Sequence, residues 1–107
     1  MSASREFAEL IAVCASWPGV EIPDGSRRGF GSKALRVNGQ IFAMESMGRL
    51  VLKLPAERVR GLLASGDGQP FTAGKAKWLK QWVSLPPNYA QAETIAREAY
   101  EFVDDLG

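Results

Sequence analysis

The sequence predicts one α+β domain over residues 1–107, in which helices pack on one face of an antiparallel β-sheet. The prediction depends on two observations. Residues 33–54 have the pattern of three strands joined by two tight turns, and amphipathic helical patterns occupy residues 4–17 and 90–106. A later strand near 82–85 is expected to join the three-stranded meander. A chain of 107 residues is long enough to form a single hydrophobic core.

The central stretch, KALRVNGQIFAMESMGRLVLKL, also predicts how its strands pair. Asn38-Gly39 favours a type I′ turn, because both residues tolerate a positive φ angle. Ser46-Met47-Gly48 suits a three-residue loop with glycine in the left-handed conformation. The pairs nearest the two turns are then Val37 with Gln40 and Glu45 with Arg49.

Side chains alternate between the two faces of a strand, so this pairing separates a leucine-rich face from a charged face. We expect the leucine-rich face to form the core. Its members are Leu35, Val37, Phe42, Met44, Leu50, Leu52 and Leu54. The other face carries Arg36, Arg49, Lys53 and Glu45, with Ile41, Val51 and two alanines between them. A binding function is therefore expected on the charged face.

The other elements follow from local signals. Ser4 and Asn88 are suitable helix caps, while Pro55 suits the first position of a short middle helix that Gly66 closes. Lys75 to Gln81 is compatible with an extended strand or with one helical turn. In chain order we expect a helix over 4–17, a short strand over 20–22, a loop over 24–31, a helix from Pro55 to near Gly66, a brief strand over 71–73, a strand over 82–85 and the longest helix over 90–106.

Both terminal helices have an apolar stripe at helical spacing, which predicts the side that faces the core. The first stripe is Phe7, Leu10, Ile11 and Cys14, and the last is Ala92, Ile95, Ala99, Phe102, Val103 and Leu106. Cys14 reads as a small core residue rather than a nucleophile, because neither a base nor a cation lies near it in the sequence.

The composition argues against the common catalytic and metal-binding sites. The chain contains no histidine, which excludes a Ser-His-Asp triad, a Cys-His pair and a histidine-bearing zinc site within it. With one cysteine there is no disulfide framework, and neither a signal-peptide layout nor an apolar stretch approaching membrane length is present. We expect a cytoplasmic, non-enzymatic protein without a cofactor or a membrane partner, and we favour a monomer.

Charge is unevenly distributed along the chain. Residues 25–85 hold eleven basic and three acidic residues, a net charge of +8, whereas residues 1–24 carry −3 and residues 86–107 carry −4. This asymmetry is typical of a protein with an anionic partner, and equally of acidic helices packed beside a basic sheet. The hypothesis of a nucleic-acid-binding surface names Arg36, Arg49, Lys53, Lys75, Lys77 and Lys80, with Trp78 and Trp82 as stacking platforms among the lysines. The alternative is that both indoles are core or half-core residues, Trp82 more so than Trp78, and that the lysines only solvate the segment.

Two other functions remain open. Ile41 and Val51 lie among charges on one predicted face, a mixture that suits a protein-interaction or regulatory module. The least supported alternative is an enzyme or small-ligand protein, with Glu45, Arg49 and the tryptophans around a pocket. Glu45 and Arg49 are more simply explained as a cross-strand charge pair.

Four segments together resemble the MmcQ/YjbR family of small bacterial proteins and, more distantly, the N-terminal domain of TfoX-type competence regulators. They are Trp17 to Glu21, VNGQIFAMESMGRLVLKLPAERV at 37–59, QWVSLPP at 81–87 and REAYEFV at 97–103. The resemblance spans nearly the whole chain and implies a frataxin-like (CyaY-like) sheet with helices on one face. It also implies DNA binding, which has been proposed for members of that family. The chain has Gln81 where a histidine is common in the YjbR-like pattern, and Glu6 and Glu9 fall short of the acidic ridge of a frataxin-like iron site.

Overall fold

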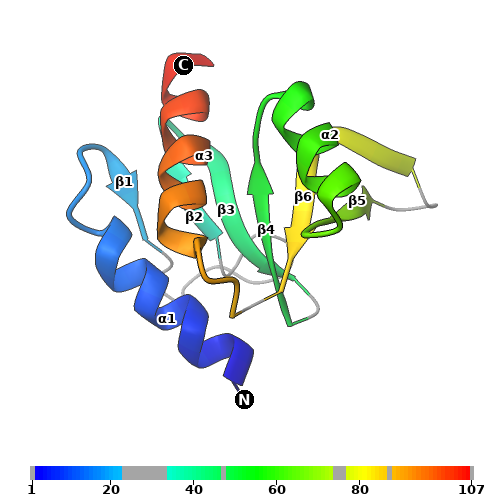
Figure 1. Ribbon diagram of the computed structural model, residues 1–107. Helices are drawn as coiled ribbons and strands as arrows, with labels where there is room; N and C mark the ends of the chain where they lie inside the picture. Colours follow the sequence, from blue (N-terminus) through cyan, green and yellow to red (C-terminus); the bar gives the residue numbers. More distant parts are fainter. Residues whose placement is uncertain (1, 23–33, 47, 74–76, 87, 107) are drawn as a thin grey trace.

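The computed structural model describes residues 2–22, 34–46, 48–73, 77–86 and 88–106, with side chains described outside 2–6, 72–73 and 77–79. Among these residues, six strands form one antiparallel sheet in the order β1-β2-β3-β4-β6-β5, and three helices lie along one face of it (Figure 1). The predicted α+β class, with helices packed on one face, is confirmed. The elements are α1 (Ser2–Cys14), β1 (Val20–Glu21), β2 (Ala34–Val37), β3 (Gln40–Ser46), β4 (Arg49–Lys53), α2 (Ala56–Ser65), β5 (Gln69–Ala73), β6 (Lys77–Leu85) and α3 (Ala92–Leu106).

The main core fills the space between the sheet and the helices. α3 contacts β2, β3 and β4, while α2 contacts β5 and β6. Leu35, Leu52 and Leu54 are fully buried in this core, and α1 contributes the fully buried Cys14. The leucines of the sheet and the predicted stripe of α1 therefore lie where the sequence placed them.

An aromatic cluster fixes the turn after α1 against the sheet and α3. Trp17 stacks on Phe42 at a ring-centroid distance of 6.5 Å and lies 5.2 Å from Tyr100, whose hydroxyl donates a hydrogen bond to the carbonyl oxygen of Pro18. The Arg97 guanidinium lies over both the Trp17 ring and the Tyr100 ring. This packing closes the core beside β1.

The first predicted turn is confirmed, and the strand it begins contains a bulge. Asn38 and Gly39 have φ angles of 55° and 77°, as a type I′ turn requires. β2 and β3 then pair as predicted through Arg36 and Ile41, but Leu35 pairs with Ala43. Phe42 is thus the extra residue of a β-bulge. The complete set of pairs is Val37 with Gln40, Arg36 with Ile41, Leu35 with Ala43 and Ala34 with Met44.

The predicted three-residue second turn is wrong. Ser46 pairs with Arg49, which leaves only residues 47 and 48 between β3 and β4, and Glu45 lies opposite Leu50 rather than Arg49. The bulge shifts the pairing of β2 with β3 by one residue from the prediction, and the shorter turn shifts the pairing of β3 with β4 by one residue in the opposite sense. The position of β4 relative to β2 is therefore the predicted one. The predicted faces are correct for β2 and β4. On β3, Met44 belongs to the charged face, whereas Glu45 and Ala43, one of the two alanines predicted there, do not.

Several boundaries also differ from the predictions. α1 begins before Ser4, so Ser4 lies inside the helix rather than at its cap. α3 begins at Ala92 instead of Ala90, so Asn88 is not adjacent to its first residue, and Leu106 at its end is 52 % exposed instead of buried. The strand predicted over 82–85 starts at Lys77, which settles the ambiguous segment as extended from that residue. The predicted loop over 24–31 lies outside the described residues.

Candidate nucleic-acid interface

We call the side of the sheet opposite the helices the second face. A separate apolar cluster lies there, formed by Ala34, Met44 and Val51 with Ile41, Phe71 and Trp82 packed around it. No described helix contributes a residue to this cluster. Met44 and Val51 are 2 % and 1 % exposed, so the middle of the second face is closed and its charged rim is the part that is accessible to a partner.

Arg49 lies on the second face and is held in place by its neighbour β6. Its Nε donates a hydrogen bond of 2.7 Å to the Ser84 hydroxyl, and its Nη2 donates one of 3.2 Å to the Ser84 carbonyl oxygen. The predicted pair with Glu45 is not the one that the strand register forms. Arg49 therefore adds positive charge to the second face while its side chain stabilises the contact between β4 and β6.

Arg36 lies apart from the other predicted cations. β2 is two strands away from β4, which corresponds to about 10 Å across the sheet. Glu21 of β1 lies directly opposite Arg36, so a carboxylate offsets part of its charge. Arg36 is thus a peripheral member of the predicted surface.

Lys53, Lys80 and Trp82 line one hollow. Strand pairing sets Lys53 opposite Trp82, and Lys80 lines the same hollow as these two residues. The Lys53 Nζ is 5.9 Å from the centroid of the Trp82 ring. Lys53, Ala56, Lys80, Gln81 and Trp82 line a hollow of about 390 Å³, which we call the Trp82 hollow.

The hollow lies at an irregularity in β6, which contributes Lys80, Gln81 and Trp82 to its lining. Pro70 of β5 pairs with Val83 and Thr72 pairs with Trp78, so one β5 residue lies opposite the four residues 79–82 of β6. Bulges of this kind bend a strand and redirect its side chains. Ala56 opens α2, so the positive end of that helix dipole lies at the rim of the hollow, with Glu57 in the same first turn.

The predicted lysines divide into two groups. Lys53 and Lys80 are brought together, with Arg49 on the same face. Lys75 lies outside the described residues, as do the side chains of Lys77 and Trp78. Sequence reasoning grouped Trp82 with the lysines of 75–80 and missed its position opposite Lys53. Only the pairing of β4 with β6, to which no turn signal pointed, brings these two residues together.

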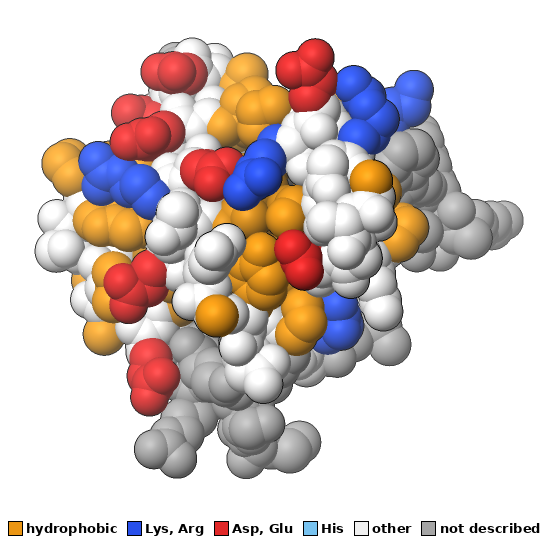
Figure 2. All heavy atoms as spheres, viewed as in Figure 1, with side chains coloured by type: hydrophobic (Ala, Val, Ile, Leu, Met, Phe, Trp, Pro, Cys, Tyr) orange, Lys and Arg blue, Asp and Glu red, His pale blue; other side chains and the backbone are white. Residues whose placement is uncertain are grey.

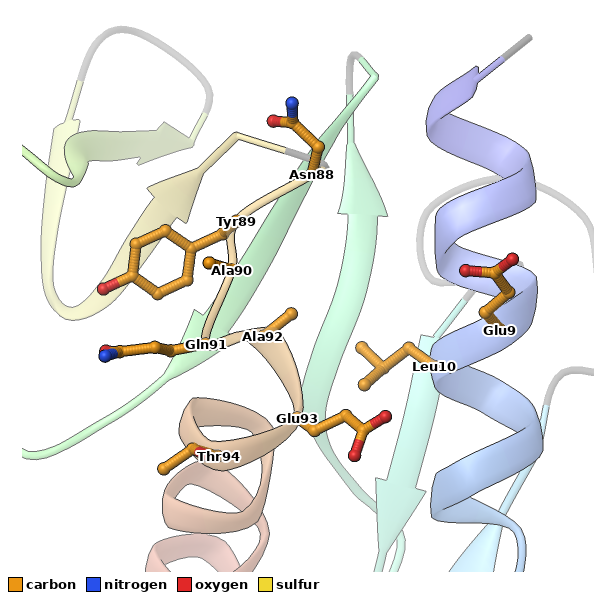
Figure 3. Close-up of a pocket in the computed structure, with 9 residues that line it drawn as sticks. All are labelled: Glu9, Leu10, Asn88, Tyr89, Ala90, Gln91, Ala92, Glu93 and Thr94. Carbon is orange, nitrogen blue, oxygen red and sulfur yellow. The ribbon is translucent and has the colours of Figure 1, made fainter.

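A second hollow, of about 400 Å³, lies between α1 and the start of α3 (Figure 3). Its polar groups include the carboxylates of Glu9 and Glu93 and the amides of Asn88 and Gln91. In Figure 3 the Glu93 side chain points from α3 toward α1.

Burial, and secondarily the nearby Glu93 carboxylate, raises the pKa of the Cys14 thiol to about 12. Cys14 is therefore a protonated core residue, as its position on the apolar stripe predicted.

The helix side of the molecule has a different charge pattern. Figure 2 shows acidic side chains spread over this side, with basic groups among them. Two ion pairs are formed there, Arg58 with Glu98 at 2.9 Å and Arg97 with Glu101 at 3.0 Å. α3 also carries the exposed residues Asp104 and Asp105. The positive rim of the second face and the acidic α3 thus lie on opposite sides of one sheet.

No family model, curated protein or solved structure matches this chain. Within the described segments, none of the helices is long and apolar enough to cross a membrane. The same segments contain no group of three or more Cys, Asp or Glu side chains able to hold a metal ion. The assignment of a function therefore depends on the chemistry of the two faces.

Proposed function

We propose that this protein is a non-enzymatic binding module that contacts DNA through the positively charged rim of its second face. The observation that carries the proposal is the hollow that Lys53, Lys80 and Trp82 share, to which the described helices contribute only Ala56. Ammonium groups neutralise phosphates, and an aromatic face beside them accepts a base. The resemblance to the MmcQ/YjbR family, for which DNA binding has been proposed, supports the same function.

The charge separation between the two faces adds to this argument. α3 carries five acidic residues and one arginine, so a polyanion approaching the helix side meets repulsion. A molecule with this polarity turns its positive rim toward DNA before contact. The electrostatic field of the protein thus favours the orientation in which the positive rim of the second face meets the phosphate backbone.

Binding of this kind is weak and depends little on sequence. Arg49 is engaged by Ser84, and no described element presents a row of side chains suited to reading base edges in a groove. Phosphate contacts then supply most of the affinity, with dissociation constants in the range of about 10⁻⁴ to 10⁻⁶ M at physiological salt. If about three phosphates are contacted, affinity falls roughly 20- to 40-fold between about 50 and 200 mM salt.

The test is a fluorescence titration of labelled single-stranded and duplex DNA over that range of salt. We expect binding at low salt that weakens steeply as salt increases. The absence of any binding of either DNA at low salt would refute the proposal. A salt-independent affinity would contradict it as well, because phosphate contacts cannot then be its source.

The protein-interaction alternative loses part of its basis in the structure. It relied on Ile41 and Val51 as an apolar contact among charges, but Val51 is 1 % exposed and Ile41 packs against the cluster that contains Val51.

The small-ligand alternative relied on a pocket near Glu45, Arg49 and the tryptophans. Trp82 lines a hollow, whereas neither Glu45 nor Arg49 belongs to its lining.

A further inference from the structure

We infer that the Trp82 hollow receives an unpaired base, so that the protein binds single-stranded nucleic acid in preference to duplex. The inference rests on the proposed function and names the form of its ligand. It concerns the hollow defined by Lys53, Ala56, Lys80, Gln81 and Trp82.

The first argument is the composition of the hollow. The residues that line its volume of about 390 Å³ carry an indole ring, a primary amide and two ammonium groups. An indole offers a flat surface for stacking, an amide both donates and accepts hydrogen bonds at the edge of a base, and ammonium groups hold the flanking phosphates. These are the groups that one nucleotide of a single strand requires.

The second argument concerns the ammonium group that already lies near the ring. The Lys53 Nζ is 5.9 Å from the Trp82 centroid, which is within the range of a cation–π contact. Lys53 and Trp82 are both partly exposed. At exposed sites a cation–π contact changes an equilibrium about 2- to 5-fold, whereas stacking of one base changes affinity about 5- to 150-fold. A base therefore displaces the ammonium group, which is free to move to a phosphate on its flexible stem.

The third argument excludes duplex as the better ligand. In a duplex the faces of the bases are stacked on one another, so Trp82 has no base to contact. The apolar centre of the second face is closed, since Met44 and Val51 are almost fully buried. A duplex thus meets only the lysines of the rim, and its affinity lacks the contribution from stacking.

Trp82 also has a structural role, which the test must separate from binding. Its ring lies 6.2 Å from that of Phe71 and packs against the cluster of the second face. Trp82→Leu keeps an apolar side chain at this position but removes the flat aromatic surface. Trp82→Phe keeps a smaller aromatic ring, and Arg60→Gln removes an exposed charge from α2 as a control.

The experiment measures the binding of a labelled thymidine oligomer of about 16 nucleotides, and of a duplex of equal length, by fluorescence anisotropy at low salt. We expect the wild type to bind the single strand at least about 5-fold more tightly than the duplex. Trp82→Leu should lose about 5- to 150-fold in affinity for the single strand and less than about 2-fold for the duplex. Trp82→Phe should lie between these proteins, and Arg60→Gln should match the wild type.

Equal wild-type affinities for the two forms would overturn the inference while leaving the proposed function in place. Equal losses of both forms in a folded Trp82→Leu variant would overturn it too, because Trp82 would then support the surface without stacking. If the wild type binds neither form, the proposed function fails and the inference fails with it. The wild-type comparison needs no variant, so it decides the question even if Trp82→Leu does not fold.

Discussion

The two faces of the sheet differ in what holds them and in what they leave accessible. The covered face packs its leucines against three helices, and Leu35, Leu52 and Leu54 are fully buried there. The second face has a small apolar centre with a rim of cations. Because β4 alternates between the faces, Leu52 and Lys53 are neighbours in sequence with opposite roles. The stability of the fold should therefore depend on the covered face, and binding should depend on the second face.

The largest expected effect is on Leu52. Leu52→Asp places a carboxylate at a fully buried position in the main core, which should cost about 4 kcal/mol or more and unfold the domain. Lys53→Glu, one residue further along β4, should leave the fold intact. Far-UV circular dichroism and thermal melting would compare the two variants. A folded Leu52→Asp variant would show that the assignment of the faces is wrong.

The glycines 61 and 68 provide a matched pair on the helix side. A Cβ atom on Gly68 would lie 2.6 Å from Cγ2 of Val83, in the contact between α2 and β6. Gly68→Ala should therefore destabilise the protein by about 1–3 kcal/mol. Nothing lies within 4 Å of a Cβ atom on Gly61, so Gly61→Ala should stabilise α2 by up to about 1 kcal/mol.

Urea denaturation would measure both free energies of unfolding. We expect the free energy of unfolding to decrease in Gly68→Ala, because its methyl group enters a packed interface. It should increase in Gly61→Ala, because alanine has a higher helix propensity than glycine. Equal effects from the two substitutions would show that the α2–β6 contact is not tightly packed.

Burial of Cys14 should make the stability dependent on pH in the alkaline range. The pKa of its thiol is raised from 9.0 to about 12 in the folded protein, so the unfolded chain releases this proton first as pH rises. The contribution is fully present below pH 9 and is lost between about pH 9 and 12. At pH 10 the loss is about 1.4 kcal/mol.

Comparison of the wild type with Cys14→Ala would isolate this contribution, because the other groups that titrate in this range are common to both proteins. The free energy of unfolding of the wild type should fall more steeply between pH 8 and 10, by about 1.4 kcal/mol. Parallel pH dependences would contradict the burial of this thiol against α3.

The sequence predicted the covered face well because its signals are local and redundant. The Asn38-Gly39 turn and the spacing of leucines agree, and Leu35, Leu52 and Leu54 lie in the core as expected. Met44 was misplaced because a β-bulge leaves no mark in residue types, and Phe42 and Ala43 are both apolar enough to face the core. The second error, in the length of the turn at residues 47–48, reversed the shift for β4.

The candidate site was less predictable than the fold. Lys53, Lys80 and Trp82 could each be named from charge and residue type, but their proximity depends on the pairing of β4 with β6 and on the irregularity of β6. The hydrogen bonds from Arg49 to Ser84 depend on the same pairing. Long-range pairing between strands that are separated by a helix has no local sequence signal, so the composition of the site followed only from the structure.

The most direct test of the division between the faces is the affinity of two charge-reversal variants for DNA at about 0.1 M salt. Lys53→Glu changes the rim of the second face, and Arg60→Glu makes the same change at an exposed position of α2. We predict a loss of about 10-fold or more for Lys53→Glu and of less than about 2-fold for Arg60→Glu. Equal losses in the two variants would mean that net charge, rather than the second face, determines binding and would contradict this account.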